Sequence, residues 1–140
     1  MALGLLARRE HSRRELVLKL RARECPEEII DAVLDALAAE GMQSDARFAE
    51  YFVLNRVERG AGPLRIRAEL LARGLDDAVI DEALAPYKGR WRDLARRAYL
   101  KRYGETAPTD ERERAKRMAF LQQRGFTPEQ VRHALGFRAD

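Results

Sequence analysis

The strongest constraint on the fold of this chain is a sequence unit that occurs three times. Three stretches align position by position: residues 20–34, 70–84 and 121–135. In each stretch a basic residue (Arg23, Arg73 or Arg124) is followed seven residues later by isoleucine or valine and eleven residues later by leucine. A period of about 50 residues is typical of tandem repeats, whose neighbouring units pack against each other.

The composition indicates that the repeats are helical. Alanine, leucine and arginine provide 63 of the 140 residues, whereas valine, isoleucine and threonine together provide 13. The first group contains strong helix formers, and the second contains the residues that favour strands. We therefore predict an all-α protein.

Each aligned stretch predicts the end of one helix, a tight turn and the start of the next helix. Gly74 and Gly125 supply the left-handed residue that closes a helix, and Thr127 begins a capping box. The first copy has Glu24 where the others have glycine. Three residues are spaced for a hydrophobic staple before the new helix: Cys25, Leu75 and Phe126. We expect Cys25 to be a buried apolar residue rather than a reactive thiol.

Two further helices precede the turn in each copy. In the first copy these are residues 3–10 and a helix that starts at a capping box on Ser12. In the second copy Ser44 begins one helix and Pro63 the next, and in the third copy Trp91 is expected in the core. The prediction is three tandem three-helix repeats, resembling helix-turn-helix bundles, at residues 1–43, 44–88 and 89–140. Such small bundles need shared interfaces, so we expect an elongated, curved array.

Charge is distributed unevenly along the chain. The first two repeats each carry a net charge of −1, and the third carries +6. The segment 90–102 contains six basic residues and one acidic residue, Asp93. The following helix is expected to add charge to this basic surface through Arg112, Arg114, Lys116 and Arg117. Arginine outnumbers lysine by 23 to 4, which favours bidentate contacts with phosphate or carboxylate. An anionic partner, either nucleic acid or acidic protein, is indicated.

The candidate binding residues form one main group and two smaller ones. The main group lies on the Trp91 helix: Arg90, Arg96, Arg97, Lys101 and Arg102. The smaller groups lie at the first turn and after the loop at residues 60–63: Arg8, Arg9, Arg13, Arg14, Arg65 and Arg67. For the smaller groups, arginines that only solvate a helix surface explain the pattern equally well.

The sequence gives no sign of an enzyme, a metal site or a cofactor. The chain has one cysteine, two distant histidines (His11 and His133) and no phosphate-loop, HExxH or GxSxG motif. It also lacks an apolar run near 18 residues and a signal-peptide pattern. We therefore expect a cytoplasmic, soluble, non-enzymatic protein that is a monomer and needs no cofactor.

The central part of the chain resembles a known family signature. The segments are Ser44-Asp45-Ala46-Arg47-Phe48-Ala49-Glu50-Tyr51-Phe52, then Arg56, then residues 60–70 with their Gly-Ala-Gly-Pro start, and Arg73-Gly74. They are similar to the signature of the bacterial regulatory protein RecX family, and residues 6–16 resemble the first-repeat motif of that family. With the triple repeat, the resemblance covers essentially the whole chain.

The resemblance implies a modulator of the RecA recombinase. RecX proteins are understood to bind the RecA filament on single-stranded DNA, to lie in its groove and to inhibit ATP hydrolysis, strand exchange and co-protease activity. This would temper recombination, DNA repair and the SOS response. By this implication the basic residues face acidic RecA surface or DNA phosphate, with weak direct DNA contact and no membrane.

A second hypothesis is a direct DNA-binding protein made of helix-turn-helix-like modules. The third helices of the first two repeats disfavour it, because they carry acidic residues where a recognition helix needs basic ones: Glu27, Glu28, Asp31 and Asp35, then Asp76, Asp77, Asp81 and Glu82. A scaffold that binds only protein is a third hypothesis.

Overall fold

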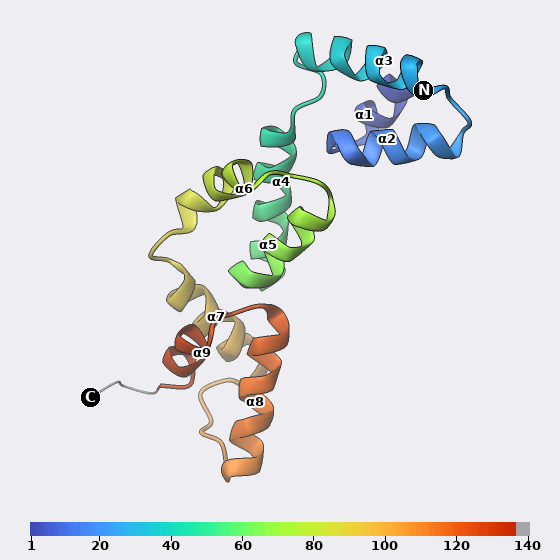
Figure 1. The fold of residues 1–140 in the computed structure, drawn as a ribbon. Coiled ribbons are helices and arrows are strands. Elements are labelled where there is room, and N and C mark those ends of the chain that lie inside the picture. Colours follow the sequence, from blue (N-terminus) through green and yellow to red (C-terminus); the bar gives the residue numbers. More distant parts are fainter. Residues whose placement is uncertain (137–140) are drawn as a thin grey trace. The chain divides into compact units, whose positions relative to one another are not determined.

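A computed structural model describes residues 1–136, and this part of the chain is helical (Figure 1). The α-helices are α1 (Ala2–Arg8), α2 (Arg13–Ala22), α3 (Glu27–Ala39), α4 (Asp45–Glu58), α5 (Pro63–Ala72), α6 (Asp77–Leu84), α7 (Trp91–Tyr103), α8 (Glu111–Arg124) and α9 (Pro128–Ala134), with a short 3₁₀ helix η1 (Ala85–Tyr87) after α6. The prediction of an all-α protein is confirmed. The first helix begins and ends slightly earlier than the predicted residues 3–10.

The predicted helix starts are present in the structure. Ser12 and Thr127 each begin a capping box. The side chain of the capping residue accepts a hydrogen bond from the backbone N–H of the third helical residue, and the side chain of that third residue accepts one from the backbone N–H of the capping residue. Asp110 caps α8 through the backbone N–H of Glu113. These caps satisfy N–H groups that a helix start leaves without partners.

The three turns of the repeat have the same backbone structure. Glu24, Gly74 and Gly125 all have positive φ, at 62°, 82° and 100°. In each turn the next residue donates its N–H to the carbonyl five positions earlier, at 3.2 to 3.3 Å, as in a Schellman motif. Glu24 thus adopts the conformation of the two glycines, which confirms the alignment of the copies at this position.

The described chain forms two compact units, and their borders fall within α4, α5 and α6. The first unit contains residues 1–52 and 69–83, and the second contains residues 53–68 and 84 onward. The core of the first repeat consists of Ala2, Leu16, Leu20, Ile30, Leu34 and Leu37. The core of the third repeat consists of Ala95, Tyr99, Leu121, Phe126, Val131 and Ala134. Helices α4 and α5 contribute residues to both units.

The staple positions differ in burial among the three copies. Phe126 and Leu75 are buried, at 2% and 3% exposure, whereas Cys25 is only half-buried and packs against the first core. Trp91 likewise packs against the third core but is half-buried rather than fully enclosed. The predicted apolar role of Cys25 and Trp91 therefore holds, with less burial than expected.

Candidate functional site

A basic hollow of about 280 Å³ lies in the second unit. Its polar lining consists of five basic side chains and one acidic side chain: Arg59, Arg97, Lys101, Arg102, Arg124 and Glu58. The rest of the lining is mostly apolar: Val57, Gly60, Leu94, Ala98 and Phe120. The lining thus combines a net positive charge with an apolar floor.

Helix α7 supplies three of the exposed cations of the hollow. Arg97 and Lys101 are four residues apart, which places them one above the other on one side of the helix, and Arg102 follows directly. All three side chains are exposed. Within residues 1–136, Arg97 and Lys101 have no hydrogen bond or ion pair, so their charges are available to a ligand.

The aromatic ring of Phe120, on α8, also lines the hollow and contacts two of its arginines. The guanidinium groups of Arg102 and Arg124 lie 5.7 and 5.1 Å from the ring centroid. The Tyr103 and Phe120 rings form a T-shaped pair with their centroids 5.6 Å apart. Arg124 also donates a hydrogen bond to the carbonyl of Arg59 at 3.0 Å. Cation–π contacts of this kind hold an arginine in place while its N–H groups remain free to bind.

Two other predicted residues of α7 have partners within the protein. Arg96 donates to the carbonyl of Ala134 at 2.5 Å and lies over the Tyr99 ring, so it joins α7 to the end of α9. Arg90 is exposed and lies 5.3 Å from the Tyr87 ring centroid. Neither residue lines the hollow. Of the five residues predicted on the Trp91 helix, only Arg97, Lys101 and Arg102 therefore belong to the candidate site.

The expectation that Arg117 adds to the basic surface is wrong. Its side chain is buried and donates hydrogen bonds to the Tyr99 hydroxyl at 2.8 Å and to the Thr106 carbonyl at 2.6 Å. It also pairs with Glu113 at 3.3 Å and lies 4.7 Å from the Tyr103 ring centroid. Arg117 therefore fastens the loop between α7 and α8 to the core of the third repeat.

The predicted arginines of the smaller groups are divided between the units. Arg8 and Arg14 are exposed, Arg9 pairs with Glu15 at 3.3 Å, and Arg13 pairs with Asp35 at 2.8 Å, all in the first unit. In the second unit Arg65 is exposed and Arg67 is half-buried, and both have partners within the protein. Arg9 and Arg13 are thus partly neutralised by their own chain.

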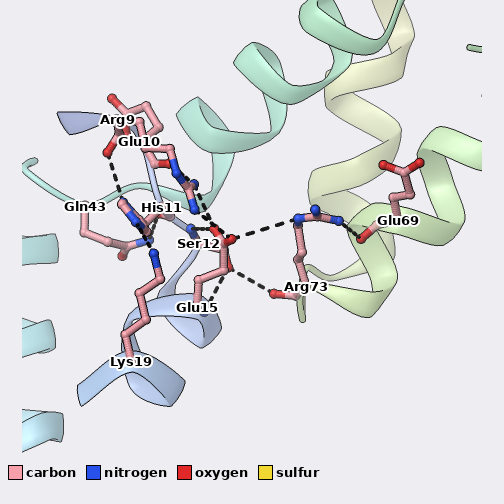
Figure 2. A network of polar contacts seen from close by, with 9 residues as sticks. All are labelled: Arg9, Glu10, His11, Ser12, Glu15, Lys19, Gln43, Glu69 and Arg73. Atoms are coloured by element: carbon pink, nitrogen blue, oxygen red, sulfur yellow. Dashed lines mark hydrogen bonds and ion pairs between the residues drawn. The ribbon is translucent and has the colours of Figure 1, made fainter. Parts of the chain in front are cut away.

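A polar network in the first unit joins the start of α2 to the turn after α5 (Figure 2). The Ser12 hydroxyl donates to the Arg73 carbonyl at 3.1 Å and accepts from the Glu15 N–H at 3.2 Å. The Glu15 carboxylate lies 4.0 Å from the Arg73 guanidinium, which itself lies over the Phe52 ring. The Ser12 hydroxyl therefore both caps α2 and binds the second repeat.

The equivalent positions make contact again in the second unit. Gly62 is equivalent to Ser12 and donates its N–H to the Arg124 carbonyl at 2.7 Å, where Arg124 is equivalent to Arg73. Leu64 donates its N–H to the Gly125 carbonyl at 2.9 Å. We call these contacts the first joint (Ser12–Arg73) and the second joint (Gly62–Arg124). Each joint links the second helix of one repeat to the turn of the next.

Two residues of the signature segment tie the first repeat to α4. The Asp45 carboxylate accepts from the Arg13 N–H at 2.9 Å and from Gln43 at 2.9 Å. Arg47 pairs with Glu10 and donates to the carbonyls of Gly41 and Met42 at 2.9 and 3.0 Å. Part of the signature therefore has a structural role in the first unit.

His11 is buried beside the first joint, with 2% of its surface exposed. Its Nε2 lies 3.1 Å from the Lys19 ammonium, which can only donate, so Nδ1 carries the proton and donates to the Arg9 carbonyl at 3.0 Å. Burial lowers the pKa of His11 below its usual 6.5, and the charges of Arg9 and Lys19 act in the same direction. Burial and the two neighbouring cations thus favour the neutral form of the histidine.

We expect acid to destabilise the first unit through His11. Because its pKa is lower in the folded chain, the unfolded chain binds more protons below pH 6.5, and stability falls as the pH falls from there. Urea unfolding followed by circular dichroism between pH 8 and 5.5 measures this effect. His11→Gln should flatten the profile, whereas the exposed His133→Gln should retain the wild-type profile. Identical profiles for wild type and His11→Gln would contradict the assignment.

Sequence reasoning missed three residues of the hollow: Arg59, Phe120 and Arg124. They lie on α8 and after α4, and no local pattern relates them to α7. The only signal was the alignment of Arg124 with Arg23 and Arg73.

Among residues 1–136 there is no cluster of metal-ligating side chains, and no helix is long and apolar enough to cross a membrane.

Three domain models of the RecX family match the chain in succession. They describe the first, second and third three-helix domains of RecX and match residues 1–37, 44–84 and 92–135. The regulatory protein RecX of Chromohalobacter salexigens is 54% identical over 134 residues, which cover 96% of this chain and 88% of that protein. The RecX protein of Halorhodospira halophila is 51% identical, with 95% and 83% coverage.

Solved structures share the fold. The crystal structure of a regulatory protein RecX matches with a TM-score of 0.82 and 25% identity, covering 95% of this chain and 68% of that one. The structure of RecX from Lactobacillus salivarius matches with a TM-score of 0.75 and 24% identity, covering 96% and 89%. The repeated turns, the three domain matches and these relatives agree. The chain therefore belongs to the RecX family of regulatory proteins, with three helix-turn-helix domains in tandem.

Proposed function

We propose that this protein binds the RecA filament on single-stranded DNA and inhibits RecA ATPase, strand exchange and co-protease activity. Membership of the RecX family supports the proposal. In this role the three repeats, at residues 1–43, 44–88 and 89–140, act as successive binding modules of a cytoplasmic monomer. Inhibition follows if one chain bridges neighbouring RecA subunits, because it then restrains the movements that the filament needs for its activities.

The basic hollow is the observation that carries the proposal. Arg97, Lys101 and Arg102 present exposed charge on α7, and Arg59 and Arg124 extend this charge onto neighbouring segments. Several cations that surround one depression suit an anionic surface, whereas isolated surface cations contribute little. We propose these residues as the main binding contacts, with Arg90 and Arg96 beside them. The remaining predicted residues would supply secondary contacts: Arg8, Arg9, Arg13, Arg14, Arg65 and Arg67.

The double variant Arg97→Glu/Lys101→Glu tests the proposal. It changes two charges that have no partner in residues 1–136, so we expect the helical content to be unchanged. Half-inhibition of RecA ATPase on single-stranded DNA should require at least about tenfold more protein, because hydrogen bonds to charged groups are strong. ATPase titrations at several salt concentrations measure the change.

The matched control reverses two exposed charges of α8 that do not line the hollow, Arg112 and Lys116. Arg112→Glu/Lys116→Glu should inhibit RecA nearly as well as wild type. Equal inhibition by both double variants would refute the proposed contacts. Unchanged RecA ATPase with the wild-type protein, combined with tight and sequence-dependent duplex binding, would instead support the direct DNA-binding hypothesis.

The exposed third helices disfavour that second function. Glu27, Glu28 and Asp31 are exposed on α3, and Asp76 and Asp77 are exposed at the start of α6. A recognition helix brings its N-terminal residues close to DNA, where carboxylates would repel the phosphates.

A further inference from the structure

We propose that the basic hollow is a phosphate-binding site that takes two or more closely spaced phosphate groups. The ligand class is a nucleotide polyphosphate or a short stretch of single-stranded nucleic acid, which share this chemistry. The inference deepens the proposed function and rests on it, because all five cations of the hollow are among the proposed RecA-binding contacts. It assigns a ligand to the hollow that does not depend on RecA.

The charge of the lining favours a polyanion. Five cations and one carboxylate surround a volume of about 280 Å³. One carboxylate side chain from a protein partner would neutralise a single charge and leave the other cations in close repulsion. Neighbouring phosphate groups carry several negative charges over a short distance and therefore match this lining better.

The arrangement of the arginines favours phosphate. A guanidinium group presents N–H donors in a planar fork that fits two phosphate oxygens. Arg102 and Arg124 both lie against the Phe120 ring, and Arg124 also donates a hydrogen bond to the Arg59 carbonyl. Because these two side chains are already restrained, binding orders fewer rotatable groups. Arg97 and Lys101 add two further exposed charges to the lining.

The size and apolar floor of the hollow limit what else it holds. Ligand pockets usually start at about 300 Å³, so this hollow accommodates part of a ligand rather than a whole folded surface. Leu94, Ala98 and Val57 are half-buried and form an apolar part of the lining. A sugar or base attached to the phosphates has an apolar surface that fits beside these residues.

The experiment measures phosphate binding with no RecA present. Fluorescence anisotropy follows a labelled twelve-residue oligothymidylate, and unlabelled competitors are inorganic tripolyphosphate, ATP and an acidic peptide of equal charge. The variants are Arg97→Gln/Lys101→Gln and the control Arg112→Gln/Lys116→Gln. We expect the first variant to weaken oligothymidylate binding at least tenfold and to lower the salt slope by about 1.4, because each single-strand phosphate contact contributes about 0.7. The control should match wild type.

The competitors identify the source of the phosphate. If tripolyphosphate and ATP displace the labelled strand at a lower concentration of negative charge than the unlabelled strand does, the hollow is assigned to nucleotide polyphosphates. The reverse order assigns it to single-stranded nucleic acid. If the acidic peptide displaces the labelled strand as well as the phosphate compounds do, the phosphate assignment is overturned. It is also overturned if the wild-type protein does not bind the labelled strand, or if both double variants weaken that binding equally. If phosphate binding fails while RecA inhibition remains, only this inference falls. If RecA ATPase is unaffected while phosphate binding follows the variants, only the proposed function falls.

Discussion

Replacement of Gly62 by alanine should destabilise the second unit by about 3 kcal/mol or more. An added Cβ would lie 2.4 Å from the carbonyl carbon of Gly125 and 2.5 Å from the Phe126 nitrogen. Both neighbours are backbone atoms, and hydrogen bonds of 2.7 and 2.9 Å hold the two segments together. The second joint therefore cannot admit a methyl group without breaking. Urea unfolding followed by circular dichroism measures the loss.

Two other glycines provide graded controls. Gly74→Ala should cost at least about 1 to 2 kcal/mol, the usual cost of a left-handed conformation without glycine, because its φ is +82°. An added Cβ would also lie 2.4 and 2.8 Å from the Cδ and Cβ atoms of Arg14, of which only the Cδ can move away easily. Gly4 has no atom within 4 Å of an added Cβ, so Gly4→Ala in α1 should stabilise slightly. A Gly62→Ala protein within about 1 kcal/mol of wild type would show that the second joint is looser than described.

Removal of the Phe126 ring should cost about 3 to 5 kcal/mol, the usual range for a buried phenylalanine replaced by alanine. Phe126 is 2% exposed and belongs to the core of the third repeat, and its N–H closes the turn after α8. Phe126→Ala leaves this hydrogen bond in place and removes only the packing. Denaturant unfolding of the variant therefore measures how much this core depends on one side chain.

The equivalent residues in the other repeats calibrate the result. Leu75→Ala should cost about 2 to 5 kcal/mol because Leu75 is equally enclosed. Cys25→Ala should cost less than about 1 kcal/mol because Cys25 is small and only half-buried. A large effect of Cys25→Ala would show that the first core depends on this position more than its burial indicates.

Local signals predicted the helix starts and turns well. The capping boxes at Ser12 and Thr127 and the left-handed residue at Gly125 depend on interactions within a few residues, which the sequence displays directly. The left-handed conformation of Glu24 was not predicted, because the other two copies have glycine at this position and a side chain disfavours positive φ. The curvature of the array and the exact repeat boundaries remain predictions.

Contacts between distant segments explain what the sequence could not predict. Arg117 occupies a charged stretch of α8, but the Tyr99 hydroxyl and the Thr106 carbonyl draw it into the interior. Arg13 pairs with Asp35, which lies 22 positions away. The hollow similarly combines α7 with Arg59 and Arg124, whose relation depends on the fold of the second unit. The net charge of each segment therefore identified the basic region of the chain, but it did not show which side chains line the hollow.

The two joints also indicate how chains of this kind change length during evolution. Each joint connects equivalent positions, with Ser12 meeting Arg73 and Gly62 meeting Arg124. Gain or loss of a whole repeat preserves this pairing, whereas an insertion within the second helix of the following repeat would shift the acceptor carbonyl away from its donor. We therefore expect homologous chains to vary in length in the segments between repeats, such as residues 40–44, and by duplication of complete units.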